Sequence, residues 1–276
     1  MLTTVCQRWV RRCARFVPPN TRFDRRRYEV APIADDRRVK AFVEAHHYSG
    51  TVPPMRWRFG LFERAELVGC AVFSVPAQDT VLAPFDPDAA TDLGRFVLLD
   101  HVPFDAETWF LARCTERLPR DLDGFVMFSD PHPRTNAQGE VVFRGHYGRI
   151  YQGFNATFLG RSHADTELLL PDGRSFARRA LSKIRARAAG DTGKRSRGWR
   201  YAVEQLVAEG APTPGPDLGA WLALVCATML RSVRHPGKFK YAFALHDRSR
   251  KRLPASLPYP RVARPTCATF EGRAVA

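Results

Sequence analysis

Two residues near the middle of the chain have side chains that could move protons. Asp130 ends the apolar run "DGFVMFSDP", which places a carboxylate where a predicted strand stops. Tyr151 follows within "GHYGRIYQGFNATFLGRS", where glycines alternate with aromatic residues around a Tyr-Gln pair. A carboxylate can act as a general base, and a phenol can protonate a leaving group or stack on a base. A plain Asp-Pro turn and a core tyrosine are the alternatives.

A third group is the sequence "HHY", which ends a predicted helix with His46, His47 and Tyr48. Adjacent helical residues point about 100° apart, so the two imidazoles are not expected to hold one metal ion together. We expect His46 to cap the helix or pack beside it, and His47 or Tyr48 to face a cleft.

The segment "RFVLLDHVPFDAETWFL" joins a strongly apolar strand to a helix. In a mixed sheet a ligand is expected at such a junction, and the first backbone amides of the helix could hold a phosphate or a thioester oxygen. An ordinary strand–helix connection is the alternative.

The charge of the chain points to a polyanionic partner. Lys and Arg number 43 against 28 Asp and Glu, which gives a formal net charge of +15. Clustered cations bind nucleic acid because they release its condensed counterions. Arg185, Arg187 and Arg195 belong to a basic stretch over 178–200 and are expected to contact phosphates, together with arginines of the first 27 residues. A generally basic surface is the alternative.

Several protein classes are disfavoured by what the sequence lacks. The six cysteines form no CxxC pair, which supports neither a zinc site nor a disulfide framework and fits a reducing compartment. There is no GxGxxG, P-loop or HExxH motif. No apolar run is long enough to cross a bilayer, so we expect no membrane partner and a cytoplasmic location, in the host cell if the chain is phage-encoded.

The order of predicted elements is that of an α/β domain. The first half comprises a helix over 35–48, two antiparallel strands over 57–63 and 66–76, a central strand over 93–100 and a helix over 105–118 with an Asp-x-Glu cap. A strand follows in "DGFVMFSDP", then a short helix entering a strand in "GRIYQGFNATFLG" and a hairpin arm with an Asp-Gly turn in "ELLLPDGR". The last elements are a helix and a strand in "DLGAWLALVCATMLRSVRHPGKFKYAFAL".

Three regions are predicted along the chain. Residues 1–27 form a basic leader, expected to be peripheral and helical because Val5, Trp9, Cys13 and Phe16 share one helical face. The catalytic domain extends over 28–246, and a basic, proline-rich tail over 247–276 is expected to be extended.

Taken in order, six segments resemble the Mom family of phage DNA-modification proteins, which is itself similar to GNAT-type acyltransferases. They are "HHYSGTVP", "LVGCAVFSVPA", "LGRFVLLDHVPFDAETWFL", "FSDP", "GHYGRIYQGFNATFLGR" and "LRSVRHPGKFKYAFAL". The resemblance implies a single domain with a mixed, mostly antiparallel sheet of six or seven strands, flanked by helices and splayed beside "LGRFVLLD". It also implies a transferase that attaches a carbamoylmethyl (acetamido-type) group to the exocyclic amine of adenine in double-stranded DNA, which protects phage DNA from host restriction.

The resemblance also implies the residues of the site. Tyr48, Asp130 and Tyr151 match catalytic positions, with Asp130 taking the amino proton. Arg95 and Thr108 match positions that hold the donor, and Thr108 stands where the family usually has serine. The target adenine is expected to be flipped out of the duplex to reach them.

The donor is left open by the sequence. A coenzyme A thioester, a glycyl-type donor on a carrier and an iron-assisted route all fit, although the loop by which acyltransferases bind the coenzyme A pyrophosphate is absent. An acyl- or aminoacyltransferase acting on tRNA or protein amines, and a DNA-binding protein without catalytic activity, are the alternative functions.

Overall fold

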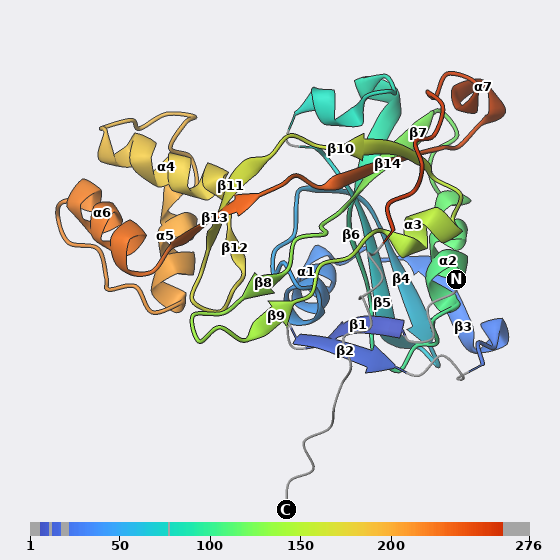
Figure 1. Ribbon diagram of the computed structural model, residues 1–276, viewed down its shortest axis with the longest axis horizontal. Helices are drawn as coiled ribbons and strands as arrows, with labels where there is room; N and C mark the ends of the chain where they lie inside the picture. The colour runs from blue at the N-terminus through green and yellow to red at the C-terminus, as the bar shows by residue number, and fades with distance from the viewer. Residues whose placement is uncertain (1–5, 11–12, 18–21, 77, 262–276) are drawn as a thin grey trace, which may run out of the picture.

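A seven-stranded sheet forms the centre of the molecule in the computed structural model, which describes residues 6–10, 13–17, 22–76 and 78–261 (Figure 1). Its strand order is β10-β14-β7-β6-β5-β4-β3, and all neighbours are antiparallel except β6 and β7. The strands are β3 (Tyr28–Pro32), β4 (Met55–Glu63), β5 (Glu66–Ser74), β6 (Ala90–Leu98), β7 (Gly124–Ser129), β10 (Thr157–Arg161) and β14 (Phe239–Ala244).

The parallel pair separates halfway along its length. β6 and β7 pair only from Ala90 with Gly124 to Leu93 with Met127. Beyond these residues β6 stays paired with β5 as far as Leu98, and β7 stays paired with β14 as far as Ser129. The two strand ends therefore diverge inside the sheet, and Asp130 follows directly after one of them.

Helices cover both faces of the sheet because successive strand residues point to opposite sides. Val39 and Val43 of α1 (Asp36–His46) pack with Cys70 and Val72 of β5 on one face. On the other face, Phe73 of β5 joins the large core that includes α2 (Ala106–Thr115) and α3 (Arg149–Gly153). The predicted cap of α1 is confirmed, since Asp35 accepts from the amide of Arg37 at 2.9 Å.

A smaller lobe extends from one end of the sheet, and we call it the helical lobe (residues 165–235; Figure 1). Its three-stranded sheet has the order β12-β11-β13. It comprises β11 (Asp165–Leu169), β12 (Ser175–Phe176), α4 (Arg178–Ala188), α5 (Trp199–Ala208), α6 (Leu218–Thr228) and β13 (Arg231–His235). The lobe has a hydrophobic cluster of its own, which includes the fully buried Ile184, Leu206 and Val225.

The predicted fold class is confirmed: a mixed, mostly antiparallel sheet flanked by helices, built as a single domain. The strands predicted at "LGRFVLLD" and "DGFVMFSDP" are the parallel pair β6 and β7. The short helix and strand expected after Gly148 are α3 and β10.

Four local predictions are wrong. The leader is not helical in its described part, because β1 (Cys6–Val10) and β2 (Cys13–Val17) form an antiparallel hairpin; Val5 lies outside the described residues. Asp105 precedes α2 in a helical conformation without a side-chain cap. The last predicted strand is two, since Pro236 and Gly237 separate β13 from β14, which lie in different sheets. The tail begins with a short helix, α7 (Asp247–Arg250).

The remaining elements are short. They are β8 (Arg134–Thr135), β9 (Val141–Phe143) and the 3-10 helices η1 (Arg25–Arg27), η2 (Asp79–Leu82) and η3 (Pro87–Ala89). None of the helices within the described ranges has the length and apolar character needed to span a membrane.

The cluster of the helical lobe should carry much of that lobe's stability. Leu206→Ala removes a fully buried side chain and should lower the free energy of unfolding by about 2–5 kcal/mol, because a cavity is left behind. Leu224→Ala is the matched control, since Leu224 of α6 is 51% exposed and its loss should cost less than about 1 kcal/mol. Urea denaturation measures both, and equal effects would contradict the assignment of the lobe core.

Candidate active site

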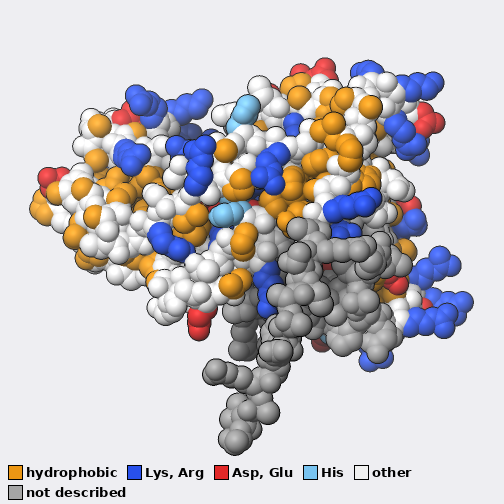
Figure 2. All heavy atoms as spheres, in the orientation of Figure 1, with side chains coloured by type: hydrophobic (Ala, Val, Ile, Leu, Met, Phe, Trp, Pro, Cys, Tyr) orange, Lys and Arg blue, Asp and Glu red, His pale blue; other side chains and the backbone are white. Residues whose placement is uncertain are grey.

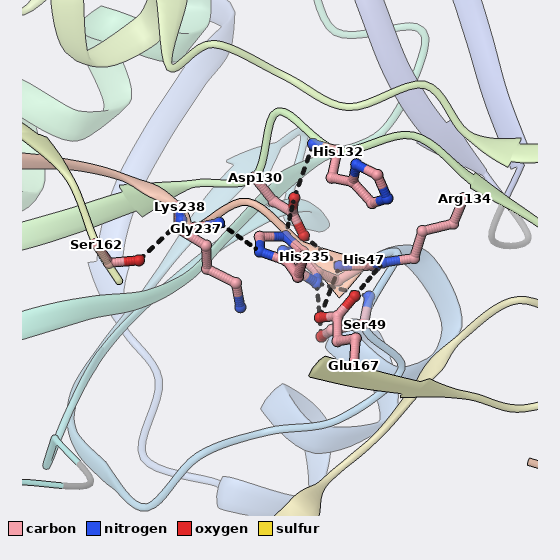
Figure 3. Close-up of polar contacts among 10 residues, drawn as sticks. All are labelled: His47, Ser49, Asp130, His132, Arg134, Ser162, Glu167, His235, Gly237 and Lys238. Carbon is pink, nitrogen blue, oxygen red and sulfur yellow. Dashed lines mark hydrogen bonds and ion pairs between the residues drawn. The ribbon is translucent and has the colours of Figure 1, made fainter. Parts of the chain in front are cut away.

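A buried carboxylate network lies where β7 ends (Figure 3), and we call it the Asp130 network: Asp130, Arg134, Glu167 and His235. Asp130 is 1% exposed. Its Oδ1 accepts from Nε2 of His235 at 2.9 Å and from the amide of His132 at 3.0 Å, and its Oδ2 accepts from Nη2 of Arg134. Arg134 also donates from Nε to Oε2 of Glu167 at 3.0 Å.

The surroundings of His235 determine which ring nitrogen carries the proton. The amide of Gly237 donates to Nδ1 at 3.0 Å, so Nδ1 is an acceptor. A neutral imidazole then carries its hydrogen on Nε2, which donates to Asp130. The turn at Gly237 requires glycine, because its φ is +101° and a Cβ there would lie 2.0 Å from the carbonyl oxygen of Ser162.

The network keeps Asp130 ionised. Burial alone would raise the pKa of this carboxyl, but the hydrogen bond from His235 and the charges of Arg134 and Lys238 outweigh burial and hold the pKa well below its ordinary value. The Arg134 guanidinium also lies over the ring of Phe143, 4.8 Å from the centroid. A buried ion pair of this kind persists only when the remaining donors and acceptors are satisfied, and here three chain segments supply the partners.

Asp130, Glu167 and His235 are also the residues that could hold the iron that the family resemblance leaves open. One ligand atom each from Asp130, Glu167 and His235 lies within 4.8 Å of the others. The set does not fit a resident metal ion in this arrangement. The Arg134 guanidinium spans both carboxylates, and His235 uses its Nε2 hydrogen to bind Asp130.

Aromatic rings line one side of the network. The ring of Tyr48 stacks between His47 and Phe143, with centroid distances of 4.3 and 4.4 Å, and lies 6.0 Å from the ring of His146. Burial and the charge of Asp130 raise the pKa of Tyr48 to about 12. Burial lowers the pKa of His146 to about 4, with Arg134 and Lys238 adding to the effect. At neutral pH this wall therefore presents a protonated phenol and uncharged imidazoles.

Tyr151 lies on α3 beside this wall. Its hydroxyl is 3.5 Å from the carbonyl oxygen of Phe128, and its ring centroid is 5.4 Å from that of Tyr241. Burial raises the pKa of Tyr151, and the neighbouring Tyr48 raises it further, so both phenols keep their protons. The role of Tyr151 as a proton donor or as a stacking surface stays a prediction.

The glycines of the Tyr151 segment bring it close to the end of β7. Gly148 precedes α3 with φ +68°, and a Cβ on it would lie 2.8 Å from ring atoms of both Tyr151 and Tyr241. Gly145 has φ +75°, and a Cβ there would lie 2.4 Å from the carbonyl oxygen of Pro131. Only glycine combines this backbone conformation with such a close approach.

Arg95 and Thr108 lie nearby but differ in how they are held. Arg95 is partly buried and donates from Nε to the carbonyl of Thr51 at 2.6 Å and from Nη2 to its hydroxyl at 3.0 Å. It therefore anchors the loop that follows Tyr48. Thr108 lies in α2 against α3, because a Cβ on Gly153 would be 3.4 Å from its methyl group.

The structure thus brings Tyr48, Asp130 and Tyr151 together, with Arg95 and Thr108 on adjoining elements. Arg185, Arg187 and Arg195 lie apart, on the helical lobe (Figure 1). Sequence reasoning missed Arg134, Glu167, His235 and His146. His235 and His146 stood inside two of the segments that carried the resemblance, whereas nothing marked Arg134 or Glu167.

The fold and the site together define a mixed sheet flanked by helices with a buried, ionised carboxylate where two parallel strands separate. The model of the Mom protein family matches residues 27–210, and the chain belongs to this family. Membership supports a role in phage DNA modification. A tandem GNAT protein from the clavulanic acid biosynthesis pathway, solved without AcCoA, is similar with a TM-score of 0.43 and 10% identity, over 79% of this chain and 99% of that one. No curated protein matches the chain.

Gly148 should be sensitive to the smallest side chain. Gly148→Ala and Gly139→Ala both place alanine at a positive φ, but nothing lies within 4 Å of a Cβ on Gly139. The clash with Tyr151 and Tyr241 should therefore cost Gly148→Ala about 1–3 kcal/mol more in unfolding free energy. Denaturant titration of the two variants measures this difference. Equal unfolding free energies would show that the segment can move away from Tyr151 and Tyr241 to accommodate the added methyl group.

The pairing of Asp130 should make part of the stability depend on pH. Its pKa is lower in the folded than in the unfolded chain, where it is about 4, so its contribution is present above that pH and is lost as pH falls further. The stability difference between the native chain and Asp130→Asn, about 3 kcal/mol at pH 7, should shrink below about pH 4. Asp247→Asn is the control, because Asp247 is 89% exposed. If the stability difference between the native chain and Asp130→Asn does not change with pH, the pairing of Asp130 is refuted.

Proposed function

We propose that the chain is a DNA-modifying transferase that attaches a carbamoylmethyl (acetamido-type) group to the exocyclic amine of adenine in phage DNA. The observation that carries this proposal is an ionised carboxylate, Asp130, that shares a site with two protonated phenols, Tyr48 and Tyr151. Membership of the Mom family and the net charge of +15 support DNA as the substrate. Protection of the phage DNA from host restriction would follow from the modification.

The proposed reaction is a substitution at the transferred carbon. The adenine nitrogen forms a bond to this carbon, and the bond from the carbon to its leaving group breaks with its electron pair going to the leaving group. The proton lost from the adenine nitrogen passes to Asp130. A phenol, Tyr151 or Tyr48, supplies the proton that the leaving group needs. For this step the donor must carry its leaving group on the methylene carbon. A coenzyme A thioester or a glycyl-type carrier would be attacked at its carbonyl carbon and would give an N-acyl adenine instead, so the structure of the adduct distinguishes these donor classes.

The hydrogen bonds of Asp130 constrain how it can act. Its two oxygens already accept three hydrogen bonds, so a new one must use the remaining acceptor site on Oδ2, beside Arg134. The carboxylate is a weak base before reaction, but the adenine amine becomes strongly acidic as its new bond forms. Removal of the proton during bond formation is typically worth about a hundred- to ten-thousand-fold in rate. His146, uncharged and bonded through its amide to the carbonyl of Asp130 at 2.7 Å, is the second candidate acceptor.

The other predicted residues support the site. Arg95 fixes the loop after Tyr48, and its remaining donors are proposed to face an anionic donor molecule. Thr108 is proposed to add a hydroxyl at the start of α2. The adenine must leave the base stack to reach Asp130, because this carboxylate is buried.

Asp130→Asn should lower the yield of modified adenine at least about a hundredfold, because an amide cannot take the proton. DNA affinity should stay within about threefold, since the near-isosteric side chain contributes little binding energy. Tyr151→Phe should be as severe if the hydroxyl is the acid, and milder if the ring only stacks. Mass spectrometry of nucleosides from cells that express each variant measures the adduct.

Two variants control for the loss of a buried carboxylate or a buried hydroxyl. Asp123→Asn removes a carboxylate that pairs with Arg252 at 3.2 Å, and Tyr28→Phe removes the hydroxyl of a buried core tyrosine. Both should keep the modification. Circular dichroism verifies that each variant is folded. Full modification by Asp130→Asn transfers the base role to His146, which His146→Gln then tests.

A further inference from the structure

A cavity of about 520 Å³ opens on the helical lobe, between the end of α4 and the start of α5. We call it the cationic cavity. Arg187 enters it from α4, and Lys194, Arg197 and Arg200 enter it from the loop 189–198 and the first turn of α5. No carboxylate is among its lining residues, so four cations converge on one space.

These four cations lack the carboxylate partners that other arginines of the lobe have. Arg174 pairs with Asp172 and Glu209, and Arg178 pairs with Asp165. No ion pair joins Arg187, Lys194, Arg197 or Arg200 to a carboxylate within the part of the chain that the structure describes. Gathering like charges without counter-charges is unfavourable unless an anion neutralises them.

The cavity is also built rather than incidental. The guanidinium groups of Arg187 and Arg200 lie 5.6 and 5.5 Å from the ring centroid of Trp199, which holds both through cation–π attraction. The loop is folded around Ser196, which is 3% exposed and whose amide donates to Oδ2 of Asp191 at 2.8 Å. This hydrogen bond shapes the segment that carries Lys194 and Arg197.

We propose that the cationic cavity binds backbone phosphates of the DNA duplex whose base is being modified, at a distance from that base. This inference rests on the proposed function. It also restricts the three arginines predicted from the sequence to contact phosphates to one, because Arg187 lines the cavity whereas Arg185 and Arg195 do not. DNA carries about one negative charge per 1.7 Å of helix axis, so a short stretch of backbone supplies several anions to four cations. Figure 2 shows Lys and Arg side chains on the lobe and between it and the main sheet.

The position of the cavity favours the DNA backbone over the group donor. The donor must reach Tyr151 on α3, whereas the cavity lies in the lobe at the other end of the molecule (Figure 1). A duplex is long enough to contact both. The lobe is also joined to the site, because its strands β11 and β13 carry Glu167 and His235, the partners of Arg134 and Asp130.

The test measures binding of an unmodified DNA duplex by fluorescence anisotropy, without any donor and over a range of salt. Arg187→Gln with Arg197→Gln should weaken binding at least about tenfold at roughly 0.1 M salt and lower the slope of log affinity against log salt by about 2. Arg185→Gln with Arg195→Gln removes the same charge from the same lobe and should weaken binding less than threefold. Trp199→Leu keeps every charge and should weaken binding while leaving the salt slope nearly unchanged.

Two results would overturn the proposal. Equal losses in the two arginine pairs would show a diffuse basic surface instead of a site. Unchanged DNA affinity in the cavity pair, with loss of coenzyme A binding measured by calorimetry, would assign the cavity to a phosphorylated small molecule. Nucleoside mass spectrometry tests the proposed function separately from the DNA site. If DNA binding depends on the cavity but the native protein forms no adenine adduct, the DNA site stands and the transferase activity is rejected.

Discussion

The buried charge of Asp130 is the constraint on which the arrangement of the site depends. An ionised carboxylate that is 1% exposed is costly unless cations and donors surround it. Its partners come from three places along the chain: Arg134 of β8, His235 of β13, and Glu167 of β11, which holds Arg134. The end of β7, the short β8–β9 hairpin and the helical lobe are therefore fixed relative to one another by one polar network.

The Asp130 network also fixes the orientation of the helical lobe relative to the central sheet. The hydrophobic cluster of the lobe is separate from the main core, so apolar packing alone would leave their orientation weakly determined. Hydrogen bonds to a buried charge have strict geometry, and they therefore determine the orientation of the lobe relative to the sheet. A phosphate held in the lobe is then at a defined position relative to Asp130, which is what delivery of one base into the site requires.

Much of the fold could be predicted from the sequence because its central elements have strong local patterns. The apolar runs that become β6 and β7 and the capped helix α1 are examples. Asp130 and Tyr151 were found because they adjoin such elements. Arg134 and Glu167 were not, because their importance comes from a contact between residues 33 positions apart, one in the short strand β8 and the other in β11 of the helical lobe. The helical prediction for the leader was wrong because its apolar spacing suits a helical face, whereas residues 6–10 and 13–17 are strands whose pairing with each other decides the structure.

The charges of the site allow a carboxylate to remain ionised in the interior of a strongly basic protein. A free negative charge near the substrate would repel phosphates, and in a chain of net charge +15 it would also draw any nearby cation. Arg134 neutralises Asp130 at contact distance, so little field extends beyond the network, while Oδ2 keeps one acceptor site. Around it, Tyr48, His47 and His146 are uncharged at neutral pH. A neutral, aromatic surround accepts an unstacked base more readily than it accepts a phosphate. In the proposed function, binding of the polyanion and binding of the base therefore fall to different parts of the molecule, which differ in charge.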